Sequence, residues 1–151
     1  MTAFNSFDEI LVFAIQREQE AQDFYTDMAR STEHAHMRQI FEAFAKEEGG
    51  HKAKLQAIKE GKHSVPTSMK IPDLKVADYH EKMTPSTDMS YDEILLLAMQ
   101  REKAAFKLYT DLAEAAEEAT TRSLFLALAQ EEAKHKLRFE LEYDREFLNE
   151  N

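Results

Sequence analysis

Apolar residues recur at spacings of three and four along four stretches of the chain, which is the period of an amphipathic helix. The pattern predicts a first helix over residues 7–31, a short polar turn at 32–35 and a second helix that ends near residue 60. A further pair of helices is predicted over residues 91–148. The chain is therefore predicted to form two helical hairpins.

The two hairpins are copies of one another. Residues 6–55 and 90–139 align without a gap at an offset of 84 positions, with 24 identities in 50. An internal match of this length indicates a duplication. Both halves open on Ser-x-x-Glu, a capping box in which the hydroxyl and the carboxylate satisfy free amide groups at a helix start. The paired residues are Ser6 with Glu9 and Ser90 with Glu93.

Residues 62–89 join the two halves and contain all three prolines of the chain, without a sustained helical period. We expect one short helix in this connection, near Leu74–Glu81. At roughly 3.3 Å per extended residue the connection can return along a whole helix, so it is predicted to be a crossover. Two antiparallel hairpins joined by a long crossover form an all-α, ferritin-like four-helix bundle.

Composition supports one helical domain over residues 1–151. The chain is 43% hydrophobic and 32% charged, with only three glycines and three prolines, too few for the turns of a many-stranded protein. Its net charge of −10 disfavours nucleic acid and anionic membrane surfaces as partners. The absence of cysteine excludes disulfides, thiolate zinc sites and a four-cysteine iron centre. Without a signal segment or a long apolar run, a cytoplasmic protein is expected.

Each apolar stripe carries a glutamate near its centre. In two of the four helices a histidine follows that glutamate by three residues, on the same helix face. In each hairpin the two glutamates are the same number of residues away from the turn that joins their helices, so they should lie at the same height. All four carboxylates are therefore predicted to lie in one layer. The six residues are Glu18, Glu48, His51, Glu102, Glu132 and His135.

Four carboxylates in an apolar core require compensating positive charge, because an uncompensated buried charge costs several kcal/mol. Two divalent cations would balance them, and two imidazoles complete a nitrogen and oxygen ligand set that suits iron, manganese or zinc. The alternative is a network of ion pairs with Arg17, Arg101 or lysines, which lie off the stripes. Glu47 and Glu131 also lie off the stripes, so we leave them out of the predicted site.

The order Glu, Glu-x-x-His, Glu, Glu-x-x-His resembles the ferritin-like di-iron carboxylate proteins, and rubrerythrins without the rubredoxin-like domain are the most similar. The resemblance covers residues 6–148 apart from the connection. It implies two bound iron ions, bridged by Glu48 and Glu132. Glu18 and Glu102 would be terminal ligands, and each histidine would cap one metal.

This chain departs from typical rubrerythrins, which carry a further carboxylate three residues from the glutamate of the third helix. Met99 and Ala105 occupy those positions here. The leading hypothesis is a di-iron oxidoreductase, a peroxidase or ferroxidase for oxidative stress or iron handling. It would react with hydrogen peroxide or dioxygen and be re-reduced by an external donor such as a rubredoxin-like protein. The alternatives are a di-iron hydroxylase and a metal-binding or iron-storage bundle without turnover.

Two further patterns bear on function. Tyr25 and Tyr109 lie two turns beyond Glu18 and Glu102, where a phenol could hydrogen-bond a ligand or quench an oxidant, or could simply pack in the core. Apolar residues off the stripes predict a second apolar face, covered by the connection or by another subunit, so a homodimer is expected. Those residues are Phe13, Phe24, Leu97 and Leu108. Gly49 and Gly50 in the second helix indicate either close packing, a local bulge or tolerated drift.

Overall fold

The computed structural model describes residues 4, 6–61, 79 and 88–148, and within these residues the chain is helical and contains no strand. The predicted all-α class is therefore confirmed. The elements in chain order are α1 (Phe7–Ser31), α2 (Ala35–Lys59), α3 (Tyr91–Ala115), α4 (Ala119–Tyr143) and a π-helical turn, η2 (Asp144–Leu148).

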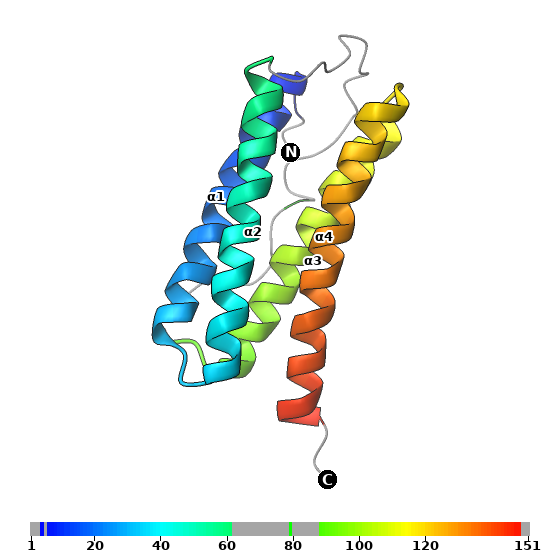
Figure 1. The fold of residues 1–151 in the computed structure, drawn as a ribbon. Helices are drawn as coiled ribbons and strands as arrows, with labels where there is room; N and C mark the ends of the chain where they lie inside the picture. Colours follow the sequence, from blue (N-terminus) through cyan, green and yellow to red (C-terminus); the bar gives the residue numbers. More distant parts are fainter. Residues whose placement is uncertain (1–3, 5, 62–78, 80–87, 149–151) are drawn as a thin grey trace. The chain divides into compact units, whose positions relative to one another are not determined.

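Helices α1 and α2 form the N-terminal hairpin, lying side by side and antiparallel (Figure 1). The Glu9 amide donates to Ser6 Oγ at 3.0 Å and so caps the start of α1. At the other end of α1, the Thr32 amide donates to the Met28 carbonyl at 2.9 Å. α2 stops before Gly61, whose φ of 75° suits a residue without a side chain. Both predicted ends of the first hairpin are therefore correct.

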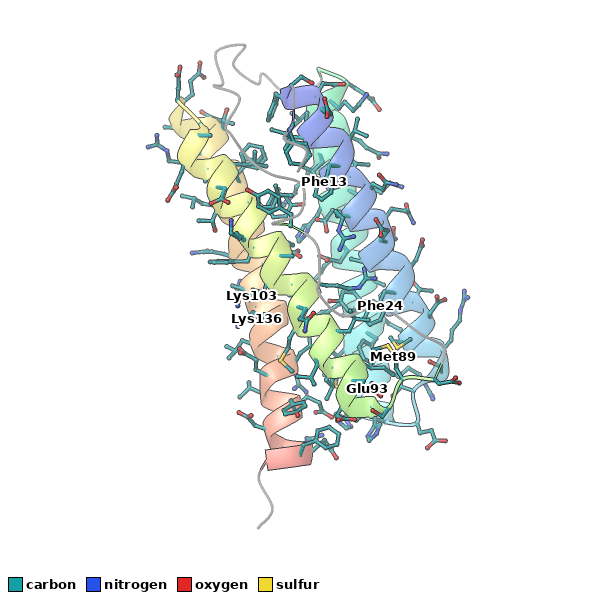
Figure 2. The ribbon with its side chains drawn as sticks, turned by 180° about the vertical axis from the view of Figure 1, so that it is seen from behind. Phe13, Phe24, Met89, Glu93, Lys103 and Lys136 are labelled. Carbon is teal, nitrogen blue, oxygen red and sulfur yellow. The ribbon has the colours of Figure 1, made fainter. Side chains whose placement is uncertain are left out.

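Helices α3 and α4 form the C-terminal hairpin in the same way. Here the capping box is complete, with the Ser90 amide donating to Glu93 Oε1 at 3.0 Å in the first turn of α3 (Figure 2). The predicted end near Leu148 is correct for the helical region as a whole. The α-helix itself ends at Tyr143 and widens into η2, where the Arg145 guanidinium pairs with Glu142 at 3.0 Å.

The buried residues follow the predicted stripes, with the predicted glutamates and histidines among them. Ile10, Ala29 and Ala45 are also buried, one position away from the stripes. Phe7 and Met28, which the spacing of three and four places at the two ends of the stripe of α1, are only half-buried. A straight helix with 3.6 residues per turn buries a band wider than a single line of spacings. The main buried residues of the four helices are Leu11, Ala14, Tyr25, Met37, Phe41, Leu55, Leu95, Ala98, Tyr109, Phe125, Leu128 and Phe139.

The second apolar face is real in α3, where Leu97 and Leu108 are buried. In α1 the matching Phe13 and Phe24 are half-buried and lie three turns apart along the helix (Figure 2). The Phe13 ring packs edge-on against Phe4, with ring centroids 5.2 Å apart. Part of this face in the N-terminal hairpin is therefore covered by Phe4, which precedes α1.

The predicted crossover and its short helix near Leu74–Glu81 lie outside the described residues, apart from Tyr79. This tyrosine is buried, and its hydroxyl donates to Asp111 Oδ2 of α3 at 2.8 Å. Lys107 Nζ lies 3.1 Å from the same carboxylate oxygen and 5.0 Å from the centre of the Tyr79 ring. The three side chains fix this point of the connection on α3.

None of the helices in the described part of the chain combines the length and the hydropathy that crossing a membrane requires.

Candidate metal centre

The N-terminal hairpin brings together three of the six predicted ligands. Glu18 comes from α1, and Glu48 and His51 lie one turn apart on the facing side of α2. His51 Nδ1 is 3.1 Å from Glu18 Oε2 and 3.1 Å from Glu48 Oε1. One donor atom from each residue lies within 4.8 Å of the others, and all three side chains are at most 5% exposed.

The C-terminal hairpin repeats this arrangement with Glu102 on α3 and with Glu132 and His135 on α4. His135 Nδ1 lies 3.5 Å from Glu102 Oε2, and a donor atom from each residue again falls within 4.8 Å of the others. All three are at most 2% exposed. Residues equidistant from a helical turn have come level in each hairpin, as the sequence spacing predicts.

The charge of His51 depends on its two carboxylate neighbours. Burial alone would lower the pKa of this imidazole, because a charged ring is poorly solvated in the core. Hydrogen bonds and charge attraction from Glu18 and Glu48 outweigh burial and raise the pKa of His51 to about 10. In the metal-free hairpin the ring therefore carries a proton at neutral pH and partly neutralises the two carboxylates.

These donors fit a metal ion. Iron, manganese and zinc all accept carboxylate oxygen and imidazole nitrogen as ligands. Each hairpin supplies two carboxylates and one imidazole. Burial of the donors excludes the water that would otherwise compete for them. Each hairpin thus holds a buried cluster of two glutamates and one histidine, a donor set of the kind that binds transition metals.

Gly49 of α2 faces the end of the Gln22 side chain of α1, beside the ligands. A Cβ at this position would lie 2.7 Å from Gln22 Nε2, closer than real side chains pack. At Gly50 a Cβ would meet no atom within 4 Å. The α-helix runs through both positions without a bulge, and at Gly49 the end of the Gln22 side chain occupies the space that a Cβ would take. Nothing in the structure explains Gly50.

Tyr25 and Tyr109 are both buried in the hairpin cores. The Tyr25 ring stacks on Phe41 at 6.1 Å between centroids, and the Tyr109 ring stacks on Phe125 at 6.4 Å. These contacts account for the rings as core residues. The role of the two phenols toward the metal ligands stays a prediction.

One buried acid was missed by the sequence reasoning. Glu142 is 1% exposed and accepts a hydrogen bond from the Tyr91 hydroxyl at 2.7 Å. Burial and this carboxylate raise the pKa of Tyr91. Glu142 follows His135 by seven residues, so continuation of the stripe by two turns was the signal that could have revealed it.

Comparison with known proteins places this geometry in a family. The family model described as Rubrerythrin matches residues 9–91 and 93–151. No curated protein matches the chain.

Two solved structures share the fold. A protein from Thermotoga maritima that is described as a ferritin-like diiron-carboxylate protein has a TM-score of 0.77 at 20% identity, over 97% of this chain and 99% of that one. A hypothetical protein from Pyrococcus furiosus has a TM-score of 0.72 at 25% identity, over 92% of this chain and 89% of that one. The likeness shows the ferritin-like four-helix fold. With a family match that spans nearly the whole chain and the expected Glu and Glu-x-x-His in each hairpin, this protein belongs to the rubrerythrin family.

Proposed function

We propose that the chain is a di-iron oxidoreductase that reacts with hydrogen peroxide or dioxygen. This proposal rests on one observation: in a member of the rubrerythrin family, each hairpin holds a buried cluster in which two carboxylates and one imidazole converge within 4.8 Å. The proposed ligands are the six residues predicted from the sequence. The diiron-carboxylate assignment of the Thermotoga maritima protein supports iron as the metal.

When bound, a pair of ferrous ions supplies two electrons, one from each ion, which together with two protons reduce hydrogen peroxide to two molecules of water. The protein's own residues would hold the charge balance. Glu18, Glu48, Glu102 and Glu132 contribute four negative charges against the four positive charges of two divalent ions. His51 would hold the metal in its neutral form, so it would lose its proton on binding.

The electrons must come from outside the chain, because it has no cysteine that could hold an iron–sulfur centre or cycle as a dithiol. A rubredoxin-like protein or a small reductant is the proposed donor. Hydroxylation of a substrate stays the alternative enzyme function. One open cavity among the described residues, of about 420 Å³ in the N-terminal hairpin, is lined by Thr26, Ala29, Arg30, Arg38, Glu42 and Ala45, none of which is a proposed ligand.

Anaerobic loading with two equivalents of Fe(II), followed by hydrogen peroxide, tests this function. We expect the near-ultraviolet absorption of ferric iron to grow and to saturate near one peroxide per two irons. A reductant should then reset the protein for further peroxide. Bound iron that stays ferrous on peroxide and oxygen addition would refute the redox function and leave a metal-binding or storage bundle.

A further inference from the structure

A buried carboxylate lies at the end of the C-terminal hairpin, away from the metal ligands. Glu142 of α4 is 1% exposed, and its Oε2 accepts a hydrogen bond from the Tyr91 hydroxyl at 2.7 Å. Its other oxygen, Oε1, lies 3.0 Å from the guanidinium of Arg145 and 3.9 Å from that of Arg138. The carboxylate therefore has a phenol on one oxygen and two cations near the other.

The internal duplication shows that the hairpin fold does not need this polar pair. The residues that match Tyr91 and Glu142 in the N-terminal hairpin are Phe7 and Ile58. Burying a carboxylate costs free energy that burying an apolar side chain does not. Because an apolar pair serves at this height in one hairpin, the tyrosine and the glutamate of the other require a reason beyond packing.

A phenol whose hydroxyl points at a carboxylate can lose one electron without leaving a charged product. Loss of the proton alone is opposed, because burial and the Glu142 carboxylate raise the pKa of Tyr91. When the electron and the proton leave together, the proton passes along the 2.7 Å hydrogen bond to Glu142 Oε2. The products are a neutral phenoxyl radical and a neutral carboxylic acid. Arg145, with a side chain 55% exposed, stays solvated when its partner loses charge.

Burial of the acceptor makes this step reversible. The Glu142 side chain is 0% exposed, so a transferred proton stays beside the phenoxyl oxygen and returns when the radical is reduced. Tyr79 also donates to a carboxylate, but the Asp111 side chain is 26% exposed and is shared with Lys107. A proton placed on Asp111 can exchange with water. The pair of Tyr91 and Glu142 is therefore the better suited to repeated oxidation.

An aromatic contact leads from Tyr91 toward the surface. The Phe147 ring of η2 lies 6.1 Å from the Tyr91 ring between centroids, and Phe147 is 36% exposed. On α4, Glu142 follows His135 by seven residues, which is about 10 Å along the helix at about 1.5 Å per residue. The pair is thus separated from the metal ligands by two helical turns and is next to an exposed ring.

We propose that Tyr91 and Glu142 form a one-electron redox site. A one-electron oxidant takes an electron from Tyr91 while the hydroxyl proton moves to Glu142, and a small reductant such as ascorbate returns the electron as the proton moves back. In peroxide chemistry, a part of the inference that rests on the proposed function, the oxidant is the hydroxyl radical. This radical forms with hydroxide when hydrogen peroxide accepts one electron instead of two, and it becomes hydroxide on taking the electron of Tyr91.

Flash photolysis of the metal-free protein with photogenerated tris(bipyridine)ruthenium(III) tests the site without iron. The neutral tyrosyl radical is followed by its absorption and by electron paramagnetic resonance. Tyr91→Phe should lose most of the radical yield, although four of the five tyrosines remain. Tyr143→Phe, next to Glu142 in the sequence, should keep the wild-type yield. Circular dichroism checks that the variants are folded.

Glu142→Gln tests the proton acceptor. The amide oxygen can still accept the hydrogen bond of Tyr91 but does not take up its proton, so radical formation should slow about 100-fold. A purely structural hydrogen bond would leave this rate unchanged. In the wild type the rate should be lower in D₂O than in H₂O, which requires no variant. A wild-type yield in Tyr91→Phe, a wild-type rate in Glu142→Gln or equal rates in the two solvents would overturn the proposal.

Freeze-quench resonance of the iron-loaded protein with hydrogen peroxide separates this inference from the proposed function. A tyrosyl radical that is present in the wild type and lost in Tyr91→Phe supports the role in peroxide chemistry. Iron that is oxidised with no difference between the two proteins would overturn that role. Iron that stays ferrous would refute the proposed function, while the photochemical experiment still decides whether Tyr91 and Glu142 form a redox site.

Discussion

Two adjacent glycines in α2 should respond to alanine to different degrees. Replacing a glycine inside a helix by alanine normally stabilises the folded state by about 1 kcal/mol. Gly50→Ala should show this gain, because its Cβ would meet no atom within 4 Å. For a chain of this size the gain corresponds to a rise in melting temperature of about 2–4 °C.

At Gly49 the same helical gain is opposed by a clash. The new Cβ would lie 2.7 Å from Gln22 Nε2 and 3.2 Å from Gln22 Cδ, whereas ordinary contact begins near 3.4 Å. The end of the Gln22 side chain must retreat by about 0.7 Å. Because a flexible, half-buried side chain can do this by adjusting its dihedral angles, the cost is about 0.5–1.5 kcal/mol. The gain for Gly49→Ala is therefore smaller than the gain for Gly50→Ala by about 0.5–1.5 kcal/mol.

Thermal and urea unfolding of the metal-free protein, held in a chelator, measure both variants without a contribution from bound metal. Gln22→Ala provides the control, because it removes the atoms that clash. In that background Gly49→Ala should recover the gain of about 1 kcal/mol. Equal stabilisation by Gly49→Ala and Gly50→Ala in the wild-type background would refute the contact between the Gly49 position and the Gln22 side chain.

The remaining predictions concern two buried polar clusters. Metal binding at pH 7 should release the proton of His51, whose pKa of about 10 keeps it charged in the metal-free protein. Calorimetry in buffers of different ionisation enthalpy measures the number of protons released, and Glu18→Gln should reduce that number. Because the pKa of His51 is raised on folding, its protonation stabilises the folded state. This contribution is fully present below about pH 6.5 and is lost as the pH rises through about 10. The free energy of unfolding of the metal-free protein should therefore fall across that interval, and should fall less in Glu18→Gln. Tyr91→Phe should lower the free energy of unfolding in urea by about 1.5–3 kcal/mol, because buried Glu142 loses a hydrogen bond of 2.7 Å. Tyr143→Phe should change this free energy little. Equal effects of the two variants would contradict this role of Tyr91.

The sequence was enough to predict the helices and their caps because both depend on local chemistry. Ser6 and Ser90 begin helices where hydroxyl and carboxylate groups can reach free amides, and a glycine with positive φ follows the end of α2. The convergence of Glu18, Glu48 and His51 also followed from counting residues to a short turn. Because residues are regularly spaced along two helices joined by a short turn, the position of each side chain along the hairpin axis has little freedom.

Contacts that depend on three-dimensional approach could not be predicted in this way. The fit of Gln22 against Gly49 depends on the distance between helix axes and on a rotamer, so the sequence left close packing, a bulge and drift as equal explanations. The stripe spacing could have marked Glu142 as buried, but its partners could not be predicted, because Tyr91 lies at a distant helix start and Arg145 in an irregular turn. The anchoring of Tyr79 on Asp111 likewise joins residues with no local relation.

The iron content of the protein after anaerobic loading with excess Fe(II) and desalting tests the central claim most directly. Wild-type protein should retain two iron ions per chain. The variant with Glu48→Ala and Glu132→Ala should lose most of this iron, while Glu47→Ala with Glu131→Ala, one position away on the same helices, should keep it. Wild-type protein that retains no iron, or a Glu48 and Glu132 variant that retains as much as the wild type, would contradict the proposed metal centre.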